Sequence, residues 1–452
     1  MEENKTSKFK YCIHTFGCQM NKSDSERVKK VLEDLSLEET QNDEEASFIL
    51  LNTCSVRKSA EDRAFSLMHK CDELKKKNKK LILAMTGCMP GRDYKGTMKK
   101  KLPMVDLYFK ISDLGSLPEM IMELNPEIGE YKESSHPYPL DYLNIKPKIE
   151  EGYKMFLPIQ TGCNRFCSYC VVPFSRGLEK NRPFEDIMCE ARSFVKNGGV
   201  YITLLGQTVN SYKFAPDEKP ALSSDNPYKS AFPALLFELN KLEGLKWIFF
   251  TAPHPDDMND ELIDALALPA VMNFLHLPVQ SGSNKILNSM RRNYTREQYL
   301  DIVEKVRKRV PDMAIGTDII VGFSGETEED FLDTVDLYKK ADFDISYTAK
   351  YSVRSGTFAA KKLVNDVSYA DKQDRWRRLQ EIMEQTTEKK NKKYEGKVVD
   401  VLFESFRDGY LDGWSYDMKK VEVKSDIDLT GKIVKVKVND ARTWILYGEL
   451  EN

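Results

Sequence analysis

The sequence predicts a multidomain α/β protein with three parts: an N-terminal doubly wound α/β domain, a central partial (β/α)6 barrel and a small C-terminal β-barrel. Short apolar runs alternate with helical periodicity in the first quarter of the chain, and six further strand-like runs separated by helical patterns follow. After Gly396 only short β runs remain. The 452 residues are enough for about three domains of roughly 150 residues each.

The first predicted domain covers residues 8–125. Strand-like apolar runs occupy 11–15, 48–51 and 81–85, and residues 60–77 have a helical pattern. The pair Ser23 and Glu26 has the spacing of a capping box, which predicts that a helix starts there, and it precedes apolar residues at helical spacing: Val28, Val31, Leu32 and Leu35. Residues 126–150 are rich in proline and charge and predict a linker.

The second predicted domain covers residues 149–380. Its six strand-like runs are 156–159, 201–205, 247–250, 274–277, 314–321 and 345–350. Right-handed crossovers between parallel strands would curl such a sheet into a partial barrel, with functional groups on the loops that follow the carboxyl ends of the strands.

The third predicted domain covers residues 383–448. A helix is expected over about 369–393, with Trp376, Leu379 and Met383 on one face. Short β runs at 398–403, 421–423, 433–438 and 444–446 then predict a small β-barrel.

Composition narrows the class of protein. No apolar run approaches the about 18 residues that a membrane helix needs, and the first residues are polar and charged, so we expect a cytoplasmic protein with no membrane contact. Nine cysteines in so long a chain do not form the framework of a small disulfide-rich domain. The net charge of −3 predicts that any contact with nucleic acid comes from a local basic patch.

Three cysteines lie in one tight loop at Cys163, Cys167 and Cys170. Three thiolates at this spacing can hold three irons of a [4Fe–4S] cube and leave the fourth iron without a protein ligand. A structural zinc site is the alternative, but it would need a fourth cysteine or histidine nearby, and none is close in sequence.

A second set of cysteines, Cys18, Cys54 and Cys88, follows three of the predicted strands of the first domain by a few residues. Parallel strands deliver the residues after their carboxyl ends to one edge of the sheet, so the three thiols are expected together. The alternative is three unrelated thiols in turns. The cysteines outside these sets are expected to be small buried residues: Cys12, Cys71 and Cys189.

The CxxxCxxC pattern at 163–170 resembles the signature of the radical S-adenosylmethionine (SAM) superfamily. The resemblance implies a [4Fe–4S] cluster whose open iron binds SAM. It also implies SAM contacts by Tyr169 at the adenine, by the glycine pair Gly198 and Gly199 at the methionine end, and by residues on the rim of the barrel: Gln280, Ser281 and Val321. The chain has Val200 where many members have Glu, and a helix C-cap explains the glycine pair equally well.

Further motifs extend the resemblance over nearly the whole chain: GCQMNKSDSE (17–26), LNTCSVRKSAE (51–61), GCNRFCSYCVVPFSRG (162–177), LGQTVNSY (205–212) and HLPVQSGS (276–283). They are similar to the methylthiotransferase family, and most similar to its tRNA-modifying MiaB type. The resemblance implies an enzyme that converts N(6)-isopentenyladenosine at tRNA position 37 to its 2-methylthio derivative. One SAM would donate a methyl group and another would provide the radical, with sulfur held at an auxiliary [4Fe–4S] cluster on Cys18, Cys54 and Cys88.

Other targets remain open at this point: threonylcarbamoyladenosine in tRNA, an aspartate of ribosomal protein S12, or no catalysis at all, in an RNA-binding protein with structural clusters. The C-terminal region resembles the RNA-binding TRAM domain of the family. Candidate phosphate contacts lie on the helix before it, at Arg375, Arg378, Lys389, Lys390 and Lys393. The expected partners are the tRNA anticodon loop and a reductase or flavodoxin-type electron donor, and we expect a monomer.

Overall fold

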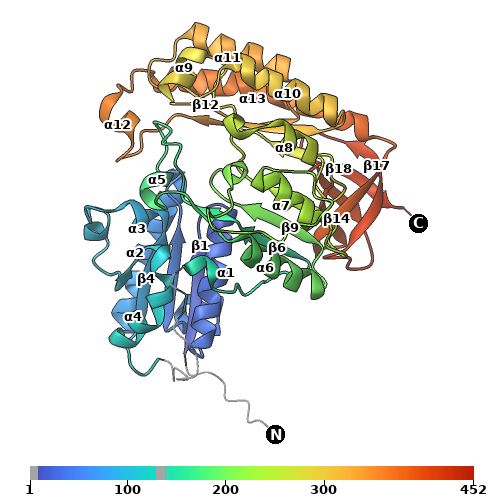
Figure 1. Cartoon of the computed structure of the whole chain (residues 1–452). Helices are drawn as coiled ribbons and strands as arrows, with labels where there is room; N and C mark the ends of the chain where they lie inside the picture. Colours follow the sequence, from blue (N-terminus) through green and yellow to red (C-terminus); the bar gives the residue numbers. More distant parts are fainter. Residues whose placement is uncertain (1–8, 57, 129–137, 140, 452) are drawn as a thin grey trace. The chain divides into compact units, whose positions relative to one another are not determined.

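The computed structural model describes residues 9–56, 58–128, 138–139 and 141–451, which form two compact units (Figure 1). The first unit holds the chain to Glu150, with Gln160–Arg165 and Cys170–Arg182. The second holds Glu151–Ile159, Phe166–Tyr169 and the chain from Pro183. The predicted start of the first domain at residue 8, and residues 129–137 and 140 of the predicted linker, lie outside the described residues.

The first unit is built on a five-stranded parallel sheet of order β2-β1-β3-β4-β5. Its strands are β1 (Lys10–Thr15), β2 (Glu38–Glu39), β3 (Phe48–Thr53), β4 (Ile82–Gly87) and β5 (Leu107–Tyr108). This order confirms the predicted doubly wound fold, because the chain reverses its direction of progress between β1 and β3. Ligands of such sheets bind at the carboxyl ends of the strands beside that reversal.

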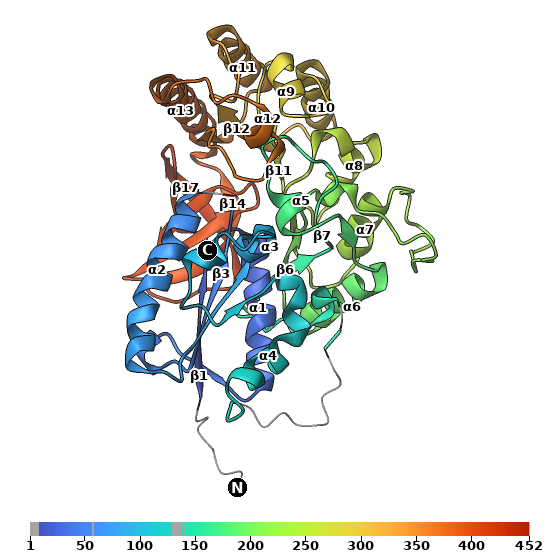
Figure 2. The same ribbon diagram turned by 90° about the vertical axis from the view of Figure 1, so that its left-hand side faces the viewer.

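Helices cover both faces of this sheet (Figure 2). On one face, α1 (Gln19–Asp34) and α4 (Leu117–Leu124) bury Val28, Val31, Leu32 and Ile121 against β1, β3 and β4. On the other face, α2 (Lys58–Lys77) buries Ala64, Met68 and Cys71. Every residue of β3 and β4 is buried, as expected for parallel strands packed on two sides. Shorter elements complete the part of the unit before Glu150: η1 (Asp43–Glu45), α3 (Cys88–Arg92), η2 (Lys99–Lys101), η3 (Ile111–Ser116) and η4 (Tyr142–Asn144).

Two expectations for this unit are wrong. Helix α1 begins at Gln19, not near Ser23, because Cys18 and Asn21 form the capping box, and Ser23 and Glu26 are buried inside the helix. The region predicted as a linker is not one throughout, since Tyr142, Leu143 and Ile145 are buried in the core under α1 and α4. The proline and charge content of that segment hid these apolar residues.

Six parallel strands form the sheet of the second unit: β6 (Lys154–Pro158), β9 (Tyr201–Leu205), β10 (Trp247–Phe250), β11 (Phe274–His276), β12 (Ala314–Val321) and β13 (Ile345–Lys350). They pair as β10-β9-β6 and β11-β12-β13, and a parallel bridge between Ile248 and Val271 links the two halves. The predicted partial barrel is therefore confirmed. Its helices are α6 (Phe184–Lys196), α7 (Ala231–Asn240), α8 (Asp260–Ala265), α9 (Asn284–Ser289), α10 (Arg296–Arg309), α11 (Glu328–Ala341), α12 (Phe358–Lys362) and α13 (Tyr369–Asn391), with η5 (Val209–Ser211) and η6 (Pro255–Asp257).

The C-terminal strands close a five-stranded barrel in the order β14-β15-β16-β18-β17, after η7 (Lys392–Tyr394). They are β14 (Val398–Arg407), β15 (Tyr410–Ser415), β16 (Lys420–Lys424), β17 (Ile433–Ala441) and β18 (Leu446–Leu450). The predicted small barrel is confirmed, although the sequence missed β15, and the last strand starts at Leu446 while Trp444 is 52% exposed in the preceding turn.

The small barrel packs against the amino ends of the strands of the six-stranded sheet. Leu402 lies in one cluster with Tyr201, Trp247 and Phe274, each the first residue of its strand. The carboxyl ends of the same strands, where sites in parallel sheets form, lie at the opposite edge. Among the described residues, none of the helices combines the length and the apolar character needed to span a bilayer.

Candidate functional site

The structure brings Cys18, Cys54 and Cys88 to the carboxyl edge of the first sheet. Cys18 caps α1, Cys54 follows the last residue of β3, and Cys88 follows the last residue of β4 and begins α3. Strands β3 and β4 are neighbours in register, with Thr53 opposite Gly87, so Cys54 and Cys88 leave adjacent strand ends.

Two glycines let the backbone around these thiols pack closely. Gly17 has φ +139°, and a Cβ there would lie 2.7 Å from the Cβ of Cys54 and 2.5 Å from Oδ1 of Asn21. Gly87 has φ +90°, and a Cβ there would lie 2.4 Å from the carbonyl oxygen of Thr53. Any larger residue at either position would force the cysteine-bearing loops apart.

Buried amide and hydroxyl groups fix the same loops, and strand periodicity alone does not reveal this supporting role. Asn21 Nδ2 donates to Asn52 Oδ1 at 2.9 Å and to the Thr53 carbonyl at 3.1 Å. Asn52 Nδ2 donates back to the Asn21 carbonyl at 2.8 Å. The Thr53 hydroxyl donates to the Thr86 carbonyl at 2.6 Å. The signal that could have found them is polar residues at the end of an otherwise apolar strand, since buried polar groups require partners.

Two arginines, Arg92 and Arg176, lie near the three thiols. Arg92 Nη2 pairs with Glu61 at 2.6 Å, and its Nε donates to the hydroxyl of Ser55, next to Cys54, at 3.0 Å. Arg176 Nη2 pairs with Asp24 on α1 at 2.7 Å, and the two side chains are only 3% and 1% exposed. Gly91 of α3 permits this second pair, because a Cβ there would lie 2.0 Å from the carbonyl of Ser175.

Arg176 acts electrostatically on the thiols. Cys18 is exposed as a residue, but protein atoms surround its thiol, and this desolvation raises the pKa of Cys18. Arg176 lowers the pKa of the same thiol in part, while the neighbouring Cys88 raises it. A fixed cation beside clustered thiols favours their thiolate form, which is the form that binds metal.

The second cysteine set lies in the loop after β7 (Gln160–Thr161). Strand β7 pairs with β8 (Lys180–Asn181), and the loop between the two strands contains the short helix α5 (Val172–Ser175). Cys163 is buried, and its amide donates to the Gly177 carbonyl at 3.2 Å. Its Sγ accepts from the Arg165 amide, and Cys170 Sγ accepts from the Val172 amide, each at 3.4 Å.

Cys167 belongs to the second unit, where its Sγ accepts from Arg292 Nη1 at 3.3 Å. Arg292 also donates to the Pro278 carbonyl, beyond β11. Hydrogen bonds to sulfur of this kind stabilise thiolates and tune iron–sulfur clusters. Sequence reasoning missed Arg292, because nothing in its local pattern marks it.

The predicted SAM contacts divide into two groups. Tyr169 is partly buried and packs edge-on against Phe323, with ring centroids 6.3 Å apart. Gln280 and Ser281 follow β11, and Val321 ends β12, so these three lie at the carboxyl edge. Gln280 has φ +72°, and its backbone pairs with Ile319 of β12.

The glycine pair is at the wrong edge. Gly198 and Gly199 precede β9, and their amides donate to the carbonyls of Val195 and Phe194 at the end of α6, so they form a helix C-cap at the amino edge of the sheet. The residues that follow β9 at the carboxyl edge begin instead with Gly206 and Gln207.

The basic helix α13 offers fewer phosphate contacts than expected. Arg375 is buried, and its Nη1 pairs with Glu326 at 2.8 Å, so it cannot reach a phosphate. Arg378 pairs with Glu328 at 2.7 Å, and Lys390 pairs with Asp342 at 3.0 Å and Asp344 at 3.3 Å. Lys389 on α13 and Lys393 on the following η7 are exposed, and within the described chain neither has an ion-pair partner.

The remaining cysteines are outside both sets. Cys12 and Cys71 are buried, as expected, whereas Cys189 is exposed on α6 and the prediction that it is buried is wrong. Cys189 lies on a helix, as predicted, but on the solvent-exposed face of that helix.

Comparison with known proteins agrees with this arrangement. The Radical SAM superfamily matches residues 157–338, and the uncharacterized protein family UPF0004 matches residues 10–110. A curated tRNA-2-methylthio-N(6)-dimethylallyladenosine synthase from Thermoanaerobacter sp. (strain X514) is 41% identical over 99% of this chain and 94% of the relative. Proteins of the same name from Caldicellulosiruptor saccharolyticus (41% identical; 99% of this chain and 93% of the relative) and Clostridium perfringens strain SM101 (39%; 99% and 99%) are similar over nearly their whole length.

Solved structures share the fold at low sequence identity. The radical S-adenosylmethionine methyltransferase TsrM from Kitasatospora setae, with cobalamin and a [4Fe–4S] cluster bound, has a TM-score of 0.54 and 12% identity over 78% of this chain and 77% of that one. The cobalamin-dependent radical enzyme OxsB has a TM-score of 0.51 and 12% identity over 84% and 56%. The full-length similarity at about 40% identity carries more weight, and by it the chain belongs to the tRNA-2-methylthio-N(6)-dimethylallyladenosine synthase family of radical SAM proteins.

Proposed function

We propose that the protein is a radical SAM methylthiotransferase that replaces the hydrogen on carbon 2 of N(6)-isopentenyladenosine, at tRNA position 37, with a methylthio group. The observation that carries the proposal is the presence of two cysteine triads. One is gathered at the carboxyl edge of the doubly wound sheet, and the other lies in the CxxxCxxC loop after β7. The names of the full-length relatives support the choice of substrate.

Each triad offers three thiolates, which would hold three irons of a [4Fe–4S] cluster and leave one iron without a protein ligand. Cys163, Cys167 and Cys170 would hold the cluster that binds SAM, and the auxiliary cluster would be held by Cys18, Cys54 and Cys88. SAM supplies a carbon radical and a methyl group, chemistry that side chains cannot supply and that the inert C–H bond of the base requires.

The chain's own residues hold and tune these groups. Gly17 and Gly87 allow the close approach of the three loops of the auxiliary triad. Arg292 and the backbone amides stabilise negative charge on the sulfurs of the second triad. At the carboxyl edge, Tyr169, Gln280 and Val321 would contact SAM, together with Gly206 in place of the glycine pair before β9. No side chain is assigned as a general base.

The wider organisation follows from the same proposal. Residues 8–125, extended by the buried segment 141–145, would form the domain of the auxiliary cluster; residues 149–380 would form the SAM core, and residues 383–448 would form a TRAM domain. Lys389 on α13 and Lys393 on η7 are the phosphate contacts that remain. We further propose a cytoplasmic monomer that receives electrons from a reductase or flavodoxin-type donor, which size-exclusion chromatography and reduction assays would test.

The test is mass spectrometry of tRNA nucleosides after anaerobic reaction of the reconstituted protein with SAM, a reductant and tRNA that carries isopentenyladenosine. The proposal expects 2-methylthio-N(6)-isopentenyladenosine together with 5′-deoxyadenosine. Methylthiolation of threonylcarbamoyladenosine or of ribosomal protein S12 instead would move the substrate assignment to those targets. Absence of 5′-deoxyadenosine from cluster-loaded protein would contradict catalysis and favour an RNA-binding role.

A further inference from the structure

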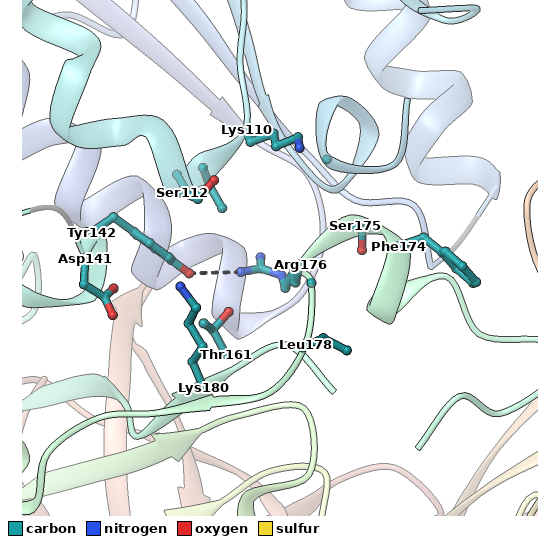
Figure 3. A pocket seen from close by; sticks show the side chains of 13 residues that line it. Lys110, Ser112, Asp141, Tyr142, Thr161, Phe174, Ser175, Arg176, Leu178 and Lys180 are labelled. Carbon is teal, nitrogen blue, oxygen red and sulfur yellow. Dashed lines mark hydrogen bonds between the residues drawn. The ribbon is translucent and has the colours of Figure 1, made fainter. Parts of the chain in front are cut away.

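A cavity of about 470 Å³ lies within the first unit, beside Arg176 (Figure 3). Three segments supply most of its lining: the turn around η3 with Lys110, the η4 segment with Tyr142, and the stretch from Phe174 to Lys180 that follows the second cysteine triad. Gly91 of α3 and Thr161 of β7 complete the lining. Its volume lies within the about 300–1,000 Å³ of cavities that hold small ligands or single groups of larger ones.

The floor of the cavity is polar and rigid. Tyr142, Thr161 and Ser175 are buried there and present hydroxyl groups. Arg176 is held in place by Asp24 at 2.7 Å and lies 3.4 Å from the Tyr142 hydroxyl. The floor therefore offers hydrogen-bonding groups, and the ion pair with Asp24 fixes one of them, the Arg176 guanidinium.

The rim carries positive charge without a matching acid. Lys110 and Lys180 are exposed, and within the described part of the chain no carboxylate pairs with either one. The one acidic side chain of the lining, Asp141, accepts the Leu143 amide at 3.0 Å as the cap of η4. Figure 3 shows the Lys180 side chain pointing toward Tyr142 and Arg176.

Apolar surface adjoins these cations. Phe174 is 42% exposed and Leu178 is 63% exposed, both on the cavity lining. Free ammonium groups beside an exposed aromatic ring are the combination that binds single-stranded nucleic acid, with lysines at phosphates and rings against bases. A small inorganic anion would make no favourable contact with these apolar side chains.

We infer that this cavity is an RNA-binding subsite in which Lys110 and Lys180 contact a backbone phosphate of the substrate tRNA and Phe174 packs against a neighbouring base. The inference rests on the proposed function for the identity of the RNA. Because Arg176 forms part of the cavity wall and also neighbours Cys18 and Cys88, RNA bound there is held next to the auxiliary triad.

The experiment measures binding of an anticodon stem-loop RNA carrying isopentenyladenosine to the cluster-loaded full chain, by fluorescence anisotropy over a series of salt concentrations. The variants are Lys110→Gln, Lys180→Gln and Phe174→Ala, and Lys79→Gln is the matched control, an exposed lysine of the same unit away from the cavity. Each lysine that contacts a phosphate should lower the slope of log affinity against log salt by about 0.7–0.9, which is about a five- to eightfold loss at 0.1 M salt relative to 1 M. Phe174→Ala should weaken binding with the slope unchanged, since stacking releases no counterion.

Iron content is measured on the same preparations and should equal that of the wild type, which shows that the variants fold and hold their clusters. Unchanged affinity and slope in both lysine variants would overturn the inference, and so would an equal effect of Lys79→Gln. Intact RNA binding with loss of the methylthio product would also overturn it, in favour of a small-anion site. Failure of the wild type to make the methylthio product refutes the proposed function separately, because that readout does not depend on the variants.

Discussion

Replacing Asp24 by Asn should destabilise the first unit by about 3–5 kcal/mol, the usual cost of removing one partner from a buried ion pair. The pair with Arg176 is 2.7 Å long, and its side chains are 1% and 3% exposed, so water cannot replace the lost carboxylate. The second carboxylate oxygen of Asp24 is buried and has no hydrogen-bond partner among the described residues. The main stabilising interaction of this carboxylate is therefore the ion pair with Arg176. Arg176 also donates to the Tyr142 hydroxyl at 3.4 Å, but this group is neutral and cannot balance its charge.

Hydrogen exchange followed by mass spectrometry locates this loss. Amides of β1, β3 and β4 that exchange through opening of the unit should exchange about two to four orders of magnitude faster in Asp24→Asn. Amides of the six-stranded sheet should keep their wild-type rates. Glu45→Gln, which breaks the exposed pair with Lys10, is the control and should leave protection as in the wild type.

The double variant Asp24→Leu/Arg176→Met shows whether the loss of stability comes from a buried charge left without a partner or from lost packing. Replacing both members of a buried pair by apolar residues of similar size is often neutral or stabilising, so the double variant should recover most of the protection lost in Asp24→Asn. Exchange rates within threefold of wild type in Asp24→Asn would refute the reasoning, and so would a double variant that exchanges as fast as the single one.

Further predictions concern both units. Gly17→Ala should lower iron content by about half, because its Cβ would lie 2.7 Å from that of Cys54; a full complement of iron would contradict the close packing of these loops. Cys54→Ala should still form 5′-deoxyadenosine but no methylthio product, and full product would disprove the role given to the auxiliary triad. Arg375→Gln should leave the salt dependence of tRNA binding unchanged while Lys389→Gln lowers its slope, and the reverse result would show that the buried arginine is released on binding. Burial alone would raise the pKa of Asp330, but hydrogen bonds from Lys285, Ser283 and Thr327 lower it to about 2. The stability gap between wild type and Asp330→Asn, measured by urea unfolding, should therefore be complete above pH 3.8 and close as the pH falls toward 2; a gap that widens on acidification would contradict this.

The cysteine positions were predictable because they depend on strand order alone. Once β1, β3 and β4 were recognised as parallel neighbours, Cys18, Cys54 and Cys88 had to lie at one edge of the sheet. The α/β architecture followed in the same way from the period of the apolar residues, which depends little on distant contacts.

Features that depend on distant contacts were missed. The start of α1 is set by Asn21, whose side chain also bonds to Asn52 across the sheet, and local spacing pointed to Ser23 instead. Arg375 has the sequence environment of an exposed helical cation, and only the position of Glu326, 49 residues away, buries it. In both cases the deciding partner lies on another element, where no local pattern can reveal it.

The glycine pair Gly198 and Gly199 was misplaced for a different reason. Glycines at a helix end and glycines that face a ligand look alike in sequence, and the deciding fact is whether they precede or follow the strand. Here they precede β9, so they cap α6.

Quantification of iron and acid-labile sulfide, with Mössbauer spectra, on anaerobically prepared protein tests the two-triad account most directly. Wild type should contain about eight irons per chain, in two [4Fe–4S] clusters, and a variant lacking either cysteine triad should contain about four. A wild-type protein with one cluster, or a triad variant that keeps all of its iron, would contradict the account.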